Sequence, residues 1–426
     1  MPLRLSKQFF VLCSLFFVCP LPIFRPSCQL IMPANNAFQH QNYPTAPVVA
    51  PVFQKVSVED SDGVEFSQLH TRLKFGKVIL VPGTFRGNDP FAFAALLSDM
   101  TKPDHPMQGM LNSVANGLKK ATVAITESVV GDIANYTDEY QQQFEELVGG
   151  DPAVEILDPL WSGQNNHQAR ADLAIKLLLQ LKRVNPSPER MMLFWGHSHA
   201  GNGLAILTNL LANNRVAVRR FFEVAGQTSD EWLEAERLLR ESPSPHPWAK
   251  SVCIAAFGTP VRYGWDTAGY RFLLHLMHHR NQQPPNSILT RPIYPMHAMK
   301  DILAAKYGDW VQAFAIAGTD APLSALDEGE SRFATMLEAG LQPPLVDEDL
   351  QKIKIKRVRE ACARWKPGTR CHTDGHHLLL EYEPSGRKTK LGAPVENARF
   401  GHGVATTTTW LPVHLALVIR ALASNL

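Results

Sequence analysis

One serine of this chain lies where its hydroxyl could act as a nucleophile. Ser198 is at the centre of Gly-His-Ser-His-Ala, residues 196–200. An apolar run, Met191 to Trp195, precedes it, and the leucine-rich segment 204–211 follows. This pattern predicts a nucleophile elbow, in which a strand turns sharply into a helix and holds the serine in a strained backbone conformation. Small neighbours are needed because larger side chains would collide with the strand and the helix, and the alanine at the last position adds only a methyl group.

A serine hydroxyl is a weak nucleophile at neutral pH, so Ser198 would need a neighbouring base. His402 is the best candidate, because glycines flank it on both sides and we expect the final helix of the chain to follow. The two histidines beside Ser198 should point away from it on a sharp turn, and the others lie in a segment that we expect at the surface or in a cap. These alternatives are His197, His199, His275, His278 and His279.

A carboxylate would have to hold this imidazole and stabilise its protonated form. Asp320 follows the apolar run 310–317, which we interpret as a strand, and the intervening Gly-Thr gives the chain room to turn. Asp266 is the rival, since it lies beyond another expected strand. We interpret Asp301 and Asp309 as helix or turn residues.

The elements that must position these side chains alternate between strands and helices from residue 77 onward. Apolar runs predict strands at 77–81, 154–160, 191–195, 251–257, 310–317 and 377–382. Amphipathic patterns predict helices at 167–183, from about 200, at 230–241 and at 410–422. A Ser-Asp-Gly turn between 55–59 and 64–69 suggests a hairpin. Alternating strands and helices indicate the α/β class, with a doubly wound, mostly parallel sheet.

Composition describes a globular chain. Of its 426 residues, 45% are hydrophobic and 19% are charged, which is enough to bury a sizeable core. The formal net charge is +2 and no long basic run occurs, which argues against nucleic acid as a partner. We expect one domain over 53–426, with helical insertions that could form a cap. The insertions are expected at about 91–150, 266–308 and 323–372.

The start of the chain allows three interpretations. Residues 1–31 contain the apolar run Phe9 to Phe24 after two basic residues, as in a signal peptide or a membrane anchor. No small-x-small cleavage site follows, and the run is shorter than the roughly 20 residues that cross a bilayer comfortably. Alternatively, translation begins at Met32. The protein would be exported or anchored in the first two cases and cytoplasmic in the third, and residues 32–52 would form a flexible lead-in.

A cluster of possible metal ligands, Cys371 to His377, precedes the last expected strand. Its spacing matches none of the usual zinc patterns, and a polar turn before a strand explains it. We therefore expect neither a metal nor another cofactor.

Together these features resemble the α/β-hydrolase fold superfamily, and within it the lipase/esterase-like serine hydrolases, over about residues 75–425. The resemblance is carried by the elbow at Ser198, by a strand ending in Pro82-Gly83-Thr84, and by His402 between the last strand and the last helix. One departure is Pro82-Gly83, where many members have His-Gly. The family order of nucleophile, acid and histidine is consistent with Asp320, although some lipases take the acid one strand earlier, as Asp266 would be.

The resemblance implies hydrolysis of a small-molecule or lipid ester through an acyl-enzyme on Ser198. The oxyanion would be bound by the N–H of His199 and that of Thr84 or Phe85. Three further residues lie after a strand beside the elbow strand and could contact substrate or equally fix their loop: Trp161, Asn166 and Arg170. Contact with a membrane is expected only through the leader. The alternative is a catalytically inactive member of the fold that serves as a binding or scaffold protein.

Overall fold

The computed structural model describes residues 37–40, 47–83, 136–157, 166–280, 301, 303–315, 328–337, 369–389 and 392–426. Its elements belong to one compact unit, Asn36–Leu426. The expected leader and most of the expected insertions lie outside the described residues.

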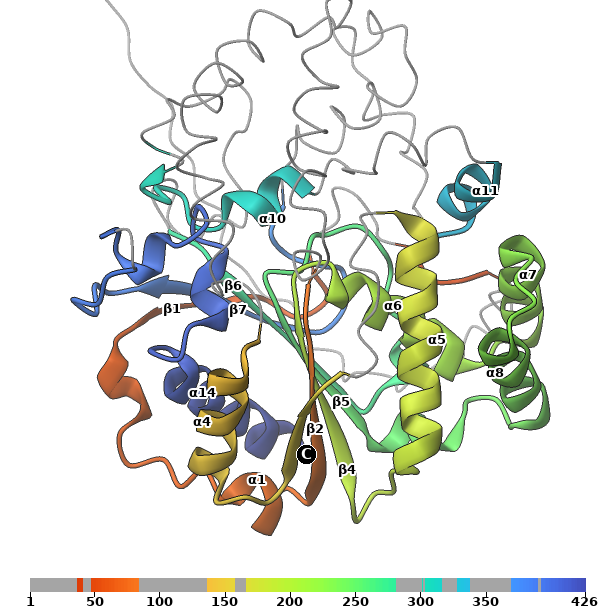
Figure 1. Ribbon diagram of the computed structural model, residues 1–426, viewed down its shortest axis with the longest axis horizontal. Helices are drawn as coiled ribbons and strands as arrows, with labels where there is room; N and C mark the ends of the chain where they lie inside the picture. Colours follow the sequence, from red (N-terminus) through yellow and green to blue (C-terminus); the bar gives the residue numbers. More distant parts are fainter. Residues whose placement is uncertain are drawn as a thin grey trace, which may run out of the picture. The chain divides into compact units, whose positions relative to one another are not determined.

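A single open sheet of seven strands organises this part of the chain (Figure 1). The strands are β1 (Val52–Val56), β2 (Phe75–Val81), β3 (Ala153–Ile156), β4 (Met191–His197), β5 (Val252–Phe257), β6 (Phe272–His278) and β7 (His376–Tyr382). Their order is β1-β7-β6-β5-β4-β2-β3, and every neighbouring pair is parallel. Parallel strands place all their carboxyl ends at one edge of the sheet, so the loops that follow β4, β6 and β7 meet there.

Helices cover both faces of the sheet (Figure 1). One face carries α5 (His167–Val184), α6 (Ala200–Ala212), α7 (Arg215–Ala225), α8 (Asp230–Glu241) and α11 (Glu328–Leu337). The other carries α1 (Gln68–Thr71), α4 (Asp138–Val148) and α14 (Leu411–Asn425). The remaining described helices are α10 (Trp310–Ala315) and the 3₁₀ turns η1 (Val58–Ser61), η3 (Pro247–Ser251), η4 (Thr267–Gly269), η7 (Val395–Asn397) and η8 (Gly403–Thr406).

Successive side chains of the central strand β4 contribute to two separate cores. Met192 and Phe194 pack with α5 and α6, whereas Leu193 and Trp195 face α4 and α14. The ring of Trp195 meets Phe144 of α4 edge-on, with the ring centroids 5.1 Å apart. A strand buried on both faces is apolar at every position, which is why its sequence reads as a continuous run instead of an alternating one.

Several predicted elements are confirmed, among them the strand and helix on either side of Ser198 and the helix 230–241. The predicted hairpin at 55–69 is wrong. β1 instead pairs parallel with β7, and helical turns η1 and α1 occupy the region after it.

Two differences after residue 270 bear on the site. Phe272–His278 was expected inside an insertion but forms β6, hydrogen-bonded between β5 and β7. The run from Trp310 was expected to be a strand but forms the helix α10. Its cap explains this, because Asp309 Oδ1 accepts a hydrogen bond from Gln312 N at 2.8 Å and so stabilises the first turn of a helix.

Among the helices of the described residues, none combines the length and the apolar character needed to cross a bilayer.

Candidate active site

Ser198 lies at the tight turn between β4 and α6. Its φ of 57° is in the left-handed region, which is uncommon for a residue other than glycine and costs on the order of 1–3 kcal/mol. The turn is tied to the neighbouring strand, because Ser198 N donates to the carbonyl oxygen of Phe257 at 2.8 Å. The strained serine predicted from the sequence is therefore present, at the carboxyl edge of the sheet.

Gly83, two residues after β2, lies against this serine. A Cβ atom added to Gly83 would lie 2.8 Å from Ser198 Cβ and 3.0 Å from the carbonyl oxygen of His197. Only glycine leaves room for so close an approach. Gly83 therefore lies beside the side chain that bears the hydroxyl group.

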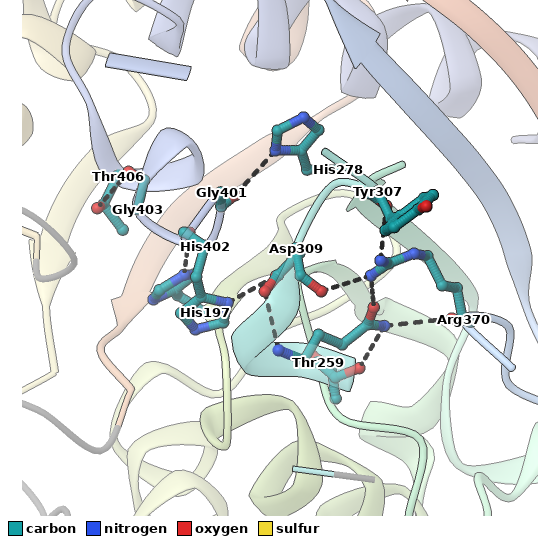
Figure 2. A network of polar contacts seen from close by, with 11 residues as sticks. His197, Thr259, His278, Tyr307, Asp309, Arg370, Gly401, His402, Gly403 and Thr406 are labelled. Atoms are coloured by element: carbon teal, nitrogen blue, oxygen red, sulfur yellow. Dashed lines mark hydrogen bonds and ion pairs between the residues drawn. The ribbon is translucent and has the colours of Figure 1, made fainter. Parts of the chain in front are cut away.

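His402 lies in the loop between β7 and α14 and contacts a buried carboxylate (Figure 2). Its Nδ1 is 2.6 Å from Asp309 Oδ2, and both residues are almost completely buried. An ionised carboxylate only accepts hydrogen bonds, so in the neutral imidazole Nδ1 carries the proton and Nε2 is the basic nitrogen. Within the described part of the chain, His402 Nε2 and Ser198 Oγ are both buried and have no hydrogen-bond partner.

Three contacts bring His402 to the same end of the sheet as Ser198. His197, the residue before the serine, stacks on His402 with ring centroids 4.4 Å apart and donates from Nε2 to its carbonyl oxygen at 3.2 Å. A Cβ atom on Gly258, which directly follows the acceptor of Ser198 N, would lie 3.1 Å from His402 Cε1. Imidazole and hydroxyl therefore share one buried region at the ends of β4 and β5.

The pKa of Asp309 lies below the ordinary value of an aspartate. Burial by itself would raise it, but the positive charge and the hydrogen bond of His402, together with the charge of Arg370, lower it further than burial raises it. Asp309 is consequently ionised at neutral pH and can stabilise a protonated imidazole.

The carboxylate that holds His402 is thus Asp309, which was interpreted from the sequence as a helix or turn residue. Asp266, the predicted rival acid, is engaged elsewhere: its Oδ1 accepts from Ala268 N at 3.0 Å at the start of η4, and burial raises its pKa. Asp320 lies outside the described residues. Asp309 follows the strand β6 and caps the helix α10. Neither element was predicted from the sequence, and for this reason Asp309 was not predicted to contact His402.

Two further histidines hold the loop that carries His402. His278, at the end of β6, donates from Nδ1 to the carbonyl oxygen of Gly401 at 3.0 Å, and His197 binds the next carbonyl along the chain. Burial lowers the pKa of His278 to about 3 and that of His197 well below its ordinary value. Both rings are therefore neutral at physiological pH and act as fixed donors.

The remaining candidate histidines contact residues other than Asp309 and His402. His199 Nδ1 is 3.3 Å from the amide nitrogen of Asn202, and His279 accepts from Arg370. His275 is stacked between His372 and His377, with centroid distances of 4.3 and 4.8 Å.

The predicted oxyanion and substrate residues are only partly described. His199 follows Ser198 and caps α6 at its N-terminus, whereas Thr84, Phe85 and Trp161 lie outside the described residues. Asn166 Oδ1 accepts from Ala169 N at 2.7 Å and caps α5. Arg170 is fully buried and donates to the hydroxyl of Tyr263 at 2.7 Å. For Asn166 and Arg170 these contacts favour the interpretation that they fix their loop.

In the residues described, no group of three or more histidine, cysteine, aspartate or glutamate side chains is arranged to hold a metal ion. Cys253 and Cys371 are buried free thiols.

Comparison of the chain with family models, with curated proteins and with solved structures found no match in any of the three.

Proposed function

We propose that this protein is a serine hydrolase that cleaves carboxylic esters, with Ser198 as nucleophile, His402 as general base and Asp309 as the acid that orients the base. One observation carries the proposal: a buried Asp309–His402 pair with a 2.6 Å contact lies at the same sheet edge as a serine held at a φ of 57°. Asp309 takes the role that the sequence assigned to Asp320 or Asp266.

In the proposed reaction, His402 Nε2 takes the proton of Ser198 as Oγ attacks the ester carbonyl carbon. The protonated imidazole then gives this proton to the departing alcohol, which leaves an acyl-enzyme. Water then loses a proton to His402 and attacks the acyl carbon, and His402 returns this proton to Ser198 Oγ as the acid is released. The negative charge of Asp309 stabilises the imidazolium in both halves of the cycle.

The oxyanion of each tetrahedral intermediate would be bound by backbone N–H groups. The N–H of His199 is suited to this because it lies at the N-terminus of α6, where the helix dipole favours negative charge. The second donor would be the N–H of Thr84 or Phe85, and the close approach of Gly83 to Ser198 supports this. Such a donor contributes roughly 3 kcal/mol in hydrolases of this type.

The order of the elements supports an α/β-hydrolase fold. The serine follows the central strand β4, the aspartate follows β6, and the histidine follows β7, so the chain order is nucleophile, acid, histidine. The catalytically inactive alternative predicts that no carboxylate reaches His402, and the contact with Asp309 counts against it.

The test is hydrolysis of p-nitrophenyl esters of increasing acyl length by the purified full chain. We expect turnover of at least one ester and loss of that turnover in Ser198→Ala, with both proteins folded by circular dichroism. A folded wild-type protein that hydrolyses none of them, or a Ser198→Ala variant as active as wild type, would contradict the proposal.

A further inference from the structure

Arg370 is a buried cation whose guanidinium group reaches the segment that carries Asp309 (Figure 2). Nη1 donates to the carbonyl oxygen of Asp309 at 2.7 Å and to Gln312 Oε1 at 2.8 Å. Nη2 donates to the carbonyl oxygen of Tyr307 at 2.8 Å, and Nε donates to His279 Nδ1 at 3.0 Å. One side chain therefore binds the residues before, at and after the acid.

All four of these acceptors are neutral. In the described part of the chain no carboxylate lies within ion-pair distance of Arg370, although only 1% of the residue is exposed. A buried charge is unfavourable unless an opposite charge compensates it. Asp309 supplies that charge, because Arg370 lowers the pKa of Asp309 while Asp309 acts against the burial that lowers the pKa of Arg370 to about 10.

Gln312 completes the arrangement around the guanidinium group. Its Nε2 donates to the carbonyl oxygens of Thr259 at 3.0 Å and of Arg370 at 3.2 Å. The network thus connects Thr259 after β5, His279 after β6 and Arg370 in the segment that leads into β7. Asp309 is the point at which this network meets His402.

We propose that Arg370 is a positioning residue for the Asp309–His402 pair. Its planar set of donors fixes the backbone from Tyr307 to Gln312, and its charge keeps Asp309 ionised while the carboxylate orients the imidazole. This inference rests on the proposed function for its kinetic consequence, but the geometry of the pair can be measured separately. Lysine keeps the charge of Arg370 and has no such planar fork, so Arg370→Lys separates the two contributions.

Loss of the positive charge of Arg370 should shift the pH profile of the proposed reaction in one direction. In the described part of the chain, the charged or titratable groups that interact electrostatically with the pair are His197 from β4, His278 from β6, Tyr382 from β7, and Arg370. Arg399, in the loop before His402, acts on His197. Removing the positive charge of Arg370 makes protonation of the imidazole easier. The acid side of the pH profile of kcat/KM should therefore move to higher pH.

The experiment compares Arg370→Met and Arg370→Lys with the control Arg215→Met. Arg215 also donates to three backbone carbonyls, those of Leu239, Arg240 and Ser242, but it lies on the exposed start of α7. For Arg370→Met we expect kcat per folded molecule to fall by about 10- to 100-fold, as for a small misplacement of a reacting group. The acid side of the profile should move up by about half a pH unit or more. Arg370→Lys should lower kcat and leave the profile in place, and Arg215→Met should change neither.

Proton NMR gives a readout that does not depend on turnover. The Nδ1 proton shared by His402 and Asp309 should give a low-field resonance that Asp309→Asn abolishes. This resonance should broaden or shift in both Arg370 variants and remain unchanged in Arg215→Met. If wild type hydrolyses no ester, the proposed function fails, while the resonance still decides the role of Arg370. A folded Arg370→Lys with wild-type kcat and resonance, or a folded Arg370→Met with a wild-type profile, would overturn the inference.

Discussion

Asp309 uses its two carboxylate oxygens for different purposes. Oδ2 holds His402 Nδ1 at 2.6 Å, and Oδ1 accepts from Gln312 N at 2.8 Å as the N-cap of α10. The helix fixes the carboxylate, and the carboxylate fixes the imidazole. A residue that looks like an ordinary cap in the sequence therefore also holds a buried imidazole.

Asp309→Asn should lower kcat for ester hydrolysis by about 10⁴, because an amide neither compensates an imidazolium nor selects the required tautomer. Asp266→Asn is the matched control, since Asp266 also caps a short helical turn but does not contact His402. We expect Asp266→Asn to retain nearly all activity. Steady-state kinetics on the folded variants measure these effects. The assignment of Asp309 as the acid would be wrong if Asp266→Asn lost activity and Asp309→Asn retained it.

At the scale of single residues, the sequence predicts those candidates that can be recognised from their neighbours in the chain. Ser198 is flanked by small residues at a strand-to-helix turn and His402 lies between glycines, so each can be found from its neighbours alone. Asp309 is far from His402 in sequence, and its identification depends on knowing which strands end at the same place. No local pattern supplies that information.

At the scale of elements, β6 and α10 determine where Asp309, the carboxylate that contacts His402, lies. β6 has the sequence Phe-Leu-Leu-His-Leu-Met-His, and the histidines near it made the region look like a surface insertion. His275 is buried within the sheet because it stacks between two other histidines, which are distant in sequence. α10 was mistaken for a strand because its run is apolar, although the aspartate before it is a standard N-cap residue. The strands β2, β4 and β5 were predictable because burial on both faces leaves continuous apolar runs. β7 was predictable from its three successive leucines, although some of its residues are only half-buried.

Gly258→Ala tests whether the end of β5 must leave space for the pair. Gly258 has a φ of 55°, and an added Cβ would lie 2.8 Å from Asp309 Oδ2 and 3.1 Å from His402 Nδ1. The variant should lose about 10- to 100-fold in kcat, the scale of a misplacement near 1 Å.

The matched control is Gly226→Ala, where φ is 58° and no atom lies within 4 Å of the added Cβ. Both variants should lose about 1–2 kcal/mol of stability from the left-handed backbone, measured by urea unfolding. Equal kcat values for the two variants would show that the space beside Asp309 is not needed.

At the scale of the whole molecule, several histidines among the described residues are buried and neutral. Burial lowers the pKa of His278, His372, His377 and His414 to about 3 each. In the unfolded chain the same groups titrate near 6.5. Between these values the unfolded chain binds more protons than the folded protein, so stability is lost as the pH falls below about 6.5.

We therefore predict acid unfolding that begins above the pH at which carboxylates titrate. Each group contributes a slope of up to about 1.4 kcal/mol per pH unit, so the four together approach roughly 5 kcal/mol per unit. Typical domain stability is about 5–15 kcal/mol, which places the transition between about pH 6 and pH 4. Circular dichroism at each pH measures this, and a protein that keeps its full stability at pH 4 would contradict the prediction.

His275→Phe keeps a flat ring in the stack and removes one group whose pKa burial lowers well below its ordinary value. It should move the acid-unfolding midpoint to lower pH. The control His70→Gln removes an exposed histidine that pairs with Asp151, and it should leave the midpoint in place.

The central claim is that Ser198 is an activated nucleophile, and covalent labelling with a fluorophosphonate probe tests it most directly. Its hydroxyl should attack the phosphorus with loss of fluoride, because His402 and Asp309 are placed to remove the proton. The account predicts one adduct per folded chain at neutral pH, located on Ser198 by peptide mass mapping and absent from Ser198→Ala. A folded wild-type protein that forms no adduct, or a Ser198→Ala variant that is labelled as fast as wild type, would contradict it.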